Sequence, residues 1–383
     1  MLISLVGTWI QAVAQSWLVF ELTGSAFLLG VVGFLGSIPI FLLSLFGGVL
    51  ADRMNKKNIL IFTQSAFMLL AFILAALTQM KLITPQEIML IAVLNGIVMA
   101  FDAPSRQAMV VDLVGKKYLH NAIALNSIAF NSSRIIGPAL AGVLVAAIGI
   151  GGCFYINGLS FLAAIYVLFA IKVNHNLNNE KNNPALRDLK DGLIFIKNNR
   201  TILILLTLTG IVSLFGVAYV MLMPIFANDI LKVGVQGLGI LMSSTGLGAL
   251  FGALTLARLG DSKHKGRFLI LSSLIFSFSL ILFSLSKTYL SSLLFLVLIG
   301  GSSVFAMALV NTLLQMKVPD KFRGRVMSVF MLTFAGIMPF GNLLGGVLSQ
   351  AYGAPFTVLV SGIICSIFFL IITIRYPQVR NIQ

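Results

Sequence analysis

The residues best able to do chemistry in this sequence are a few polar side chains that interrupt long apolar stretches. Arg134 carries a fixed positive charge inside one of them. A guanidinium in apolar surroundings is costly unless it meets a partner, so it would pair with an anionic ligand or tune a nearby carboxylate. The alternative is structural, with the side chain near the inner end of its segment and hydrogen-bonded to Asn131 and neighbouring carbonyls.

Carboxylates are scarce in the same stretches. Glu21, Asp102 and Asp229 stand close to the ends of apolar segments, and none stands clearly at a middle. A coupling carboxylate needs surroundings that change between two states, and the sequence does not single one out. Seven further side chains could line a cavity, namely Gln11, Gln15, Asn95, Asn126, Asn131, Phe215 and Asn311. Each amide among them could equally join two helices.

Metal and cofactor chemistry has no support in the sequence. Cys153 and Cys365 lie in apolar runs, and the histidines lie in polar connectors, so neither a disulfide nor a metal site is expected. The sequence has no Gly-x-x-x-x-Gly-Lys-Ser/Thr loop, which excludes ATP hydrolysis by a P-loop. Catalytic groups are not clustered either. We therefore expect no enzyme activity and no cofactor.

The composition indicates what kind of protein surrounds these residues. Of 383 residues, 58% are hydrophobic and only 10% are charged, against about 25% charged in soluble domains. The formal charge of +15 would suggest nucleic-acid binding in a soluble protein. A chain this apolar cannot cover a soluble surface, so we expect a multi-pass membrane protein without a nucleic-acid partner.

Nearly every apolar run is long enough to cross a membrane, which takes roughly 20 residues in a helix. Glycine and proline inside the runs are typical of membrane helices, and strand periodicity is absent. The predicted fold class is an all-α membrane protein with twelve spans. We place them at about 1–20, 26–51, 58–79, 86–104, 121–148, 152–171, 201–228, 235–257, 267–286, 289–315, 326–351 and 354–375.

The basic residues set the expected orientation. Most of the 26 Lys and Arg residues fall in connectors on one face, and only Lys81, Lys232 and Lys287 fall on the other. By the positive-inside rule the basic face is cytoplasmic, with both termini on it and anionic lipid headgroups against it. The chain is apolar from Ile3 onward, so its first segment is expected to be a true helix lacking a short lead rather than a signal peptide.

A polar stretch, Val173–Arg200, separates a predicted bundle at 1–172 from a second one at 201–383. Four apolar residues in this linker have helical spacing, which predicts an amphipathic helix that lies on the inner leaflet or packs on the protein. They are Leu186, Leu189, Leu193 and Ile196.

The two bundles repeat one another in sequence. Leu45–Gly47 matches Leu250–Gly252, and Gly137–Leu144 matches Gly341–Leu348 at nearly the same offset. Two separated matches indicate duplicated, pseudo-symmetric six-helix bundles. Parallel repeats of this kind place a substrate cavity at their interface, so the architecture is that of an alternating-access transporter.

A charged loop follows the second span, reading Gly-Gly-Val-Leu-Ala-Asp-Arg-Met-Asn-Lys-Lys over 47–57. It resembles the signature loop of the major facilitator superfamily, and the resemblance extends over essentially the whole chain. In that superfamily the Asp steadies the outward-open state against span 11, and a basic residue pairs with an acid near span 4. The resemblance implies a gating group with a close helix approach at Gly48 and a pair between Lys56 and Asp102. The group is Gly48, Asp52, Arg53, Lys56, Lys57, Asp102 and Arg106.

The fifth span contains a second motif, Asn131–Gly142, which is similar to the antiporter motif of drug exporters. Proline removes a backbone hydrogen bond and small neighbours permit close packing, so the helix could bend or seal against span 8. The similarity implies export rather than import. The motif residues are Gly137, Pro138, Ala141 and Gly142.

Further segments look like one bacterial branch of the superfamily, which includes enterobactin exporters and macrolide-efflux proteins. They include Gly7–Ser25 and Ala100–Ala108. The resemblance implies a monomeric transporter in the bacterial cytoplasmic membrane that exports a small amphipathic drug or siderophore-like molecule by proton antiport. Two alternatives stay open: a facilitator that imports a small solute, and a scaffold or receptor that no longer transports.

Replacing Asp52 by Asn tests the gating assignment. The substitution removes a negative charge that would face the positive end of a helix. We expect slower substrate efflux from reconstituted vesicles, with unchanged membrane insertion. Unchanged efflux at equal protein loading would remove Asp52 from the gate.

Overall fold

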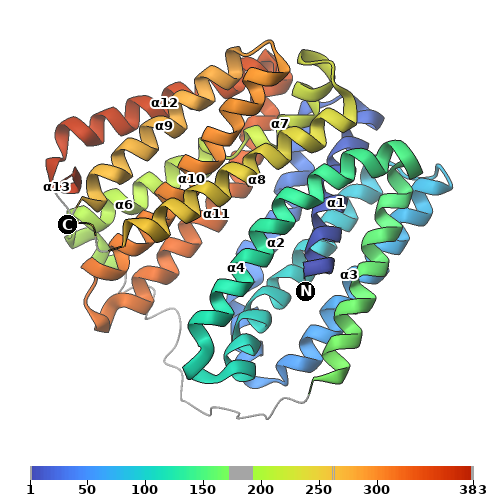
Figure 1. The fold of residues 1–383 in the computed structure, drawn as a ribbon, viewed down its shortest axis with the longest axis horizontal. Coiled ribbons are helices and arrows are strands. Elements are labelled where there is room, and N and C mark those ends of the chain that lie inside the picture. The colour runs from blue at the N-terminus through green and yellow to red at the C-terminus, as the bar shows by residue number, and fades with distance from the viewer. Residues whose placement is uncertain (1, 172–192, 261, 263, 381–383) are drawn as a thin grey trace. The chain divides into compact units, whose positions relative to one another are not determined.

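The computed structural model describes residues 2–171, 193–260, 262 and 264–380, and within them every regular element is a helix (Figure 1). Eleven helices in these residues are long and apolar enough to cross a membrane. One of them, Asn121–Ala170, is interrupted at Gly149, where φ is 75°, and so provides two spans. The all-α prediction is confirmed, and each predicted span coincides with a helical segment.

The helices differ in how regular they are. Span 7 is built from four short pieces, two of them π-helical, whereas the other spans are continuous or share α4. In chain order the elements are α1 (Leu2–Thr23), α2 (Ala26–Arg53), α3 (Lys56–Gln79), α4 (Pro85–Ala170), α6 (Arg200–Ile211), η1 (Val212–Gly216), α7 (Tyr219–Ile225), η2 (Phe226–Ile230), α8 (Gly234–Leu259), α9 (Lys265–Leu285), α10 (Tyr289–Lys317), α11 (Asp320–Tyr352), α12 (Ala354–Arg375) and α13 (Pro377–Arg380).

The long element α4 consists of three segments, 85–114, 116–148 and 150–170, which are separated by the non-helical glycines Gly115 and Gly149. The first segment extends ten residues beyond the predicted end of span 4 at about residue 104, because the helix continues through Pro104. Proline removes only the hydrogen bond to the carbonyl four residues earlier, which here is that of Ala100. A helix supported by its neighbours tolerates this loss.

The chain divides into two compact units (Figure 1). Unit 1 comprises Met1–Glu180 with Lys232–Ser243, and unit 2 comprises Lys181–Leu231 with Ser244–Gln383. In unit 1, α1, α2 and α3 all pack against α4. In unit 2, α9 packs against α10 and α12, and α11 packs against η1 and α12.

Matched glycines make matched helix contacts in the two units. A Cβ atom on Gly47 of α2 would collide with the carbonyl oxygen of Ala100, and one on its repeat partner Gly252 would collide with that of Gly301. The repeat inferred from the sequence is therefore visible in the packing. The predicted close approach at Gly48 is wrong, because a Cβ there would meet nothing within 4 Å; it is the preceding glycine that faces α4.

A second matched pair joins different helices. Gly137 in the 116–148 segment lies against Trp9 of α1, where a Cβ would be 3.0 Å from the carbonyl oxygen of Val6. Its repeat partner Gly341 lies against η1, where a Cβ would be 2.5 Å from the carbonyl oxygen of Leu214. In each unit a glycine at the equivalent repeat position thus brings the fifth helix close to the first.

Most of the predicted linker helix lies outside the described residues, including Leu186 and Leu189. Its end is described, and residues 193–198 are helical. Ile196 is 4% exposed, and Phe195 stacks on Phe322 of α11 with ring centroids 4.4 Å apart. The described end of the linker therefore packs on unit 2, which is the second of the two arrangements expected for it.

Gly47→Ala is expected to destabilise the protein by about 1–3 kcal/mol, because the added methyl group must push α2 away from α4. Gly48→Ala is the matched control. It should change stability by less than about 1 kcal/mol, since the new methyl meets open space. Thermal unfolding of both variants in detergent measures the difference, and equal melting temperatures would contradict this account of the α2–α4 contact.

Candidate functional site

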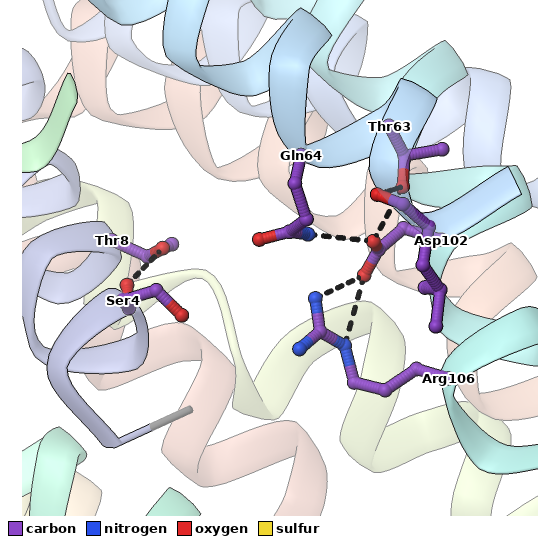
Figure 2. A network of polar contacts seen from close by, with 7 residues as sticks. Ser4, Thr8, Thr63, Gln64, Asp102 and Arg106 are labelled. Carbon is purple, nitrogen blue, oxygen red and sulfur yellow. Dashed lines mark hydrogen bonds and ion pairs between the residues drawn. The ribbon is translucent and has the colours of Figure 1, made fainter. Parts of the chain in front are cut away.

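A buried carboxylate joins α3 to α4 inside unit 1. Asp102 is 2% exposed, and its Oδ1 atom accepts hydrogen bonds from Thr63 Oγ1 and Gln64 Nε2, both at 2.8 Å. Figure 2 shows Thr63 and Gln64 converging on this oxygen from α3, with the amide oxygen of Gln64 pointing away. That amide oxygen is buried and has no hydrogen-bond partner in the described structure.

The other oxygen of the same carboxylate binds an arginine. Asp102 Oδ2 accepts from Arg106 Nε at 3.0 Å and from Nη2 at 2.7 Å, and Figure 2 shows the guanidinium reaching back along α4 to it. Because the 85–114 segment continues past Pro104, about 18 Å of helix separate Asp102 from its inner end. The helix is thus longer than the roughly 30 Å of the hydrocarbon core, and the position of Asp102 near an end of its span stays a prediction.

The signature loop is held by two lysines at the start of α3. Lys56 Nζ pairs with Asp112 Oδ2 at 2.6 Å, so the predicted pair between Lys56 and Asp102 is wrong. Asp112 lies ten residues, about 15 Å, further along the helix toward the loop. Asp102 is already paired with Arg106. Arg53 is exposed, and the side chain of Asp52 is outside the described structure.

Lys57, the second of these lysines, caps the C-terminal end of α4. Lys57 Nζ donates to the carbonyl oxygens of Phe169 at 3.2 Å and Ile171 at 2.8 Å. A cation at this position satisfies carbonyls that the helix leaves free and faces the negative end of its dipole. Nearby, α3 and two segments of α4 share a buried apolar cluster of Leu60, Met109 and Leu168.

The motif of the fifth span contacts the start of α8, and both belong to unit 1. A Cβ atom on Gly142 would lie 2.9 Å from the carbonyl oxygen of Gln236, and one on Gly239 would collide with the carbonyl oxygen of Pro138. Ser243 Oγ donates to the carbonyl oxygen of Ile135 at 2.7 Å. Small residues on both helices therefore allow backbone-to-backbone contact here, and Ala141 between them is fully buried.

Arg134 is half-buried in the 116–148 segment. About 27 Å of helix separate it from residue 116 and about 22 Å from Gly149, which places it in the middle of the segment rather than at an end. Among the described residues it has no hydrogen-bond or ion-pair partner. Asn131, its predicted structural partner, donates instead to the carbonyl oxygen of Ser127 at 2.8 Å.

The amides predicted to line a cavity have different surroundings. Gln11 is buried and its Oε1 accepts from Asn157 Nδ2 at 2.6 Å, so it joins α1 to the last segment of α4. In unit 2, Asn311 Oδ1 accepts from Gln315 of the same helix at 2.8 Å. Gln15, Asn95 and Phe215 are half-buried, and the Oδ1 atom of Asn126 is buried without a partner in the described structure. Gln11 is therefore a packing residue, which was the alternative reading for each amide.

Several residues of the site were missed in the sequence. They are Thr63, Gln64, Asp112 and Asn157. The adjacent polar pair Thr63-Gln64 inside an apolar span was a usable signal, because polar side chains at that depth need partners. Asp112 gave no such signal, because it falls where a connector between two spans was expected.

The sequence profile of the family described as transmembrane secretion effector matches residues 1–382. The chain belongs to this family. It is therefore a membrane transporter of the major facilitator superfamily and not an enzyme, as the signature loop implied.

Characterised relatives align over almost the whole chain. The staphyloferrin A transporter of Staphylococcus aureus is 28% identical, covering 93% of this chain and 89% of that protein. The enterobactin exporter EntS of Shigella boydii is 25% identical, with coverage of 99% and 91%. Macrolide efflux protein A of Streptococcus pyogenes is 23% identical, with coverage of 100% and 94%. The predicted branch of the superfamily is confirmed.

Solved structures support the fold of this family member. A D-xylose–proton symporter superposes with a TM-score of 0.77 at 12% identity, covering 99% of this chain and 98% of that one. The nucleoside transporter NupG gives 0.75 at 15% identity, with coverage of 98% and 97%. The major facilitator fold predicted from the sequence is confirmed.

The Gln11–Asn157 contact predicts a measurable coupling. Gln11→Leu and Asn157→Leu should each destabilise the protein, because each leaves a buried amide without its partner. The double variant should cost less than the sum of the two by about 0.6–1.7 kcal/mol, the range for such pairs in membranes. Thermal unfolding of the four proteins gives this coupling energy, and strictly additive effects would contradict the pairing.

Proposed function

We propose that this chain exports a small, anionic, siderophore-like molecule across the bacterial cytoplasmic membrane by proton antiport, with both termini in the cytoplasm. The observation that carries the proposal is Arg134, a half-buried guanidinium in mid-span that has no partner among the described residues. A charge kept at this depth needs an anionic or carbonyl ligand to offset its desolvation. A transported anion supplies that ligand.

The backbone at Arg134 adds a hydrogen-bond acceptor beside the cationic side chain. Pro138 has no N–H group, so it cannot donate to the carbonyl of Arg134 four residues before it. The helix therefore presents a cationic donor and a carbonyl acceptor at one level of the membrane. This pair suits a ligand with carboxylate or phenolate oxygens and hydroxyl groups, which are the iron-binding groups of siderophores.

The names of the relatives favour the same class of substrate and the same direction of transport. One is a staphyloferrin A transporter and another an enterobactin exporter. A second candidate substrate is a macrolide, because macrolide efflux protein A is also a relative. Macrolides that carry an amine are cationic at neutral pH, so an unpaired guanidinium favours the siderophore class over them.

Arg134→Met is expected to lower kcat/KM for an anionic siderophore by at least about tenfold, since a charge-assisted hydrogen bond contributes about 1.5–3 kcal/mol. Arg134→Lys should retain part of the activity. Efflux of staphyloferrin A, enterobactin and erythromycin from reconstituted vesicles gives the comparison, with erythromycin unaffected or improved. Arg375→Met, an exposed arginine at the end of α12, is the control for loss of positive charge.

The same vesicles distinguish the other functions. Substrate efflux that requires a proton gradient directed opposite to substrate movement supports antiport. Substrate uptake down its own concentration gradient, without pH dependence, would indicate a facilitator. If no compound of the panel crosses the membrane above the rate of empty vesicles, the scaffold alternative is favoured. Normal siderophore efflux by Arg134→Met would overturn the assignment of Arg134 to the substrate.

A further inference from the structure

We propose that Trp9 and Phe130 bind an aromatic ring of the substrate beside Arg134, so that the transporter prefers aromatic anions to aliphatic anions of equal charge. The inference deepens the proposed function and rests on it, because it takes Arg134 as the group that binds the anion. Binding and efflux are measured separately below, so the two assignments can fail independently.

Trp9 of α1 and Phe130 of the 116–148 segment form an aromatic pair within unit 1. Their ring centroids are 6.3 Å apart and the ring planes meet at 67°, an edge-to-face arrangement. Phe130 is 47% exposed and Trp9 is half-buried. Two rings at a steep angle form an open corner, in which a third ring can stack on one and meet the edge of the other. Both geometries are favourable for aromatic groups.

Arg134 lies on the same face of its helix as this pair. Residues 130, 134, 137 and 141 recur at spacings of four, three and four, which places them on one stripe. Trp9 contacts this stripe at Gly137, where an added Cβ would collide with its own Cβ, and its ring reaches Phe130. About 10 Å of helix separate Gly137 from Phe130. The indole therefore passes the level of Arg134.

The stripe points away from the apolar exposed side of its helix. Ile136, Leu140 and Val143 are exposed, and at 100° per residue they lie on roughly the opposite side from Arg134. Apolar side chains are the ones that hydrocarbon can solvate, so that side suits contact with lipid. The Arg134 side faces α1 instead, through Gly137.

The open positions of α1 around Trp9 have the same character. They recur at helical spacing and include two polar side chains, whereas a lipid-facing stripe would be apolar. Thr8 and Ala12 are exposed, and Trp9 and Gln15 are half-buried. Trp9 thus belongs to a polar stripe of its helix, as Arg134 does.

Two hydrogen-bond donors at this level lack partners. Within the described residues, neither the indole N–H of Trp9 nor the guanidinium of Arg134 makes a hydrogen bond. An indole N–H that is removed from water ordinarily finds an acceptor. A ring that carries a carboxylate and a hydroxyl group provides acceptors for both donors, because its charge pairs with the guanidinium and its hydroxyl oxygen accepts from the indole.

The combination of groups favours an aromatic anion over other ligands. Aromatic faces also attract cations, but a cation bound here would be repelled by Arg134. An aliphatic anion would pair with Arg134 and gain no stacking from Trp9 or Phe130. A carboxylated aromatic ring with hydroxyl groups, as in a catechol-based siderophore, uses the guanidinium, the indole N–H and the ring faces together.

The two tryptophans of the chain make binding measurable by fluorescence. Trp17→Phe leaves Trp9 as the sole tryptophan, and Trp9→Phe leaves Trp17. The full chain in nanodiscs is titrated with 2,3-dihydroxybenzoate and with cyclohexanecarboxylate, which has the same charge and ring size but no aromatic face. The aromatic acid should quench Trp9 emission saturably, and the cyclohexane acid should not. Because both proteins contain one emitter, the Trp17-only protein corrects for light absorbed by the ligand.

Substitutions in the Trp17→Phe protein separate the contributions. Phe130→Leu keeps an apolar side chain without the aromatic face, and should raise the Kd for 2,3-dihydroxybenzoate about fivefold or more. Arg134→Met should raise the same Kd about tenfold or more. Phe278→Leu changes an exposed phenylalanine of α9 in unit 2, and should leave the Kd unchanged.

Efflux from reconstituted vesicles relates the site to transport. Enterobactin has aromatic rings and staphyloferrin A has none, so Trp9→Ala should lower kcat/KM for enterobactin at least about fivefold more than for staphyloferrin A. Trp17→Ala is the matched control in the same helix and should affect both compounds equally. Unfolding temperatures identify variants that fail to fold, and Phe130→Leu, at an exposed position, serves if Trp9→Ala is one of them.

Trp9 emission that does not respond to 2,3-dihydroxybenzoate would overturn the proposal, as would equal affinity for the two acids. Equal losses of enterobactin and staphyloferrin A efflux in Phe130→Leu would overturn it too, and the proposed function would stand if Arg134→Met still impaired both. Saturable quenching that depends on Arg134, without efflux of either compound, would refute export and leave the ring-binding site assigned.

Discussion

The cost of leaving a polar group unpaired inside a membrane governs the polar interior of unit 1. Asp102 is paired with Arg106, Lys56 with Asp112, and Lys57 with the carbonyls at the end of α4. The amides of Gln11 and Asn157 bind one another. Each pairing satisfies groups that hydrocarbon cannot solvate. Among the described residues Arg134 has no hydrogen-bond or ion-pair partner, and the amide oxygens of Gln64 and Asn126 have none either.

The apolar part of the fold depends on a second constraint, which is how closely helix backbones can approach. With no hydrophobic driving force between helices in lipid, association relies on contact between backbones, and glycine permits it. Gly47 and Gly252 do this for the second helix of each unit, and Gly137 and Gly341 do it for the fifth. Because Pro104 cannot donate to the Ala100 carbonyl, α2 packs at Gly47 against a buried carbonyl that lacks its usual helical donor.

The sequence was sufficient for the spans, the repeat and the family, because hydropathy over about 20 residues and matched glycines are properties of the chain itself. Contacts of side chains were predicted less well. The loop motif did not say whether Gly47 or Gly48 faces α4, since one residue turns a helix by about 100°. The partner of Lys56 was assigned to Asp102 from the resemblance, which places an acid near span 4. Once the helix continues, Asp112 is brought to the loop and Asp102 is left in the interior with Arg106.

The two polar contacts between α3 and α4 differ in burial and therefore in strength. Lys56 and Asp112 keep 16% and 28% of their side chains exposed, and ion pairs near water contribute little because solvent screens them. Asp102 is buried beneath this pair, and removing one partner of a buried ion pair costs several times more. The Lys56–Asp112 pair is therefore the weaker connection, and α3 is joined to α4 more firmly at Thr63 and Gln64.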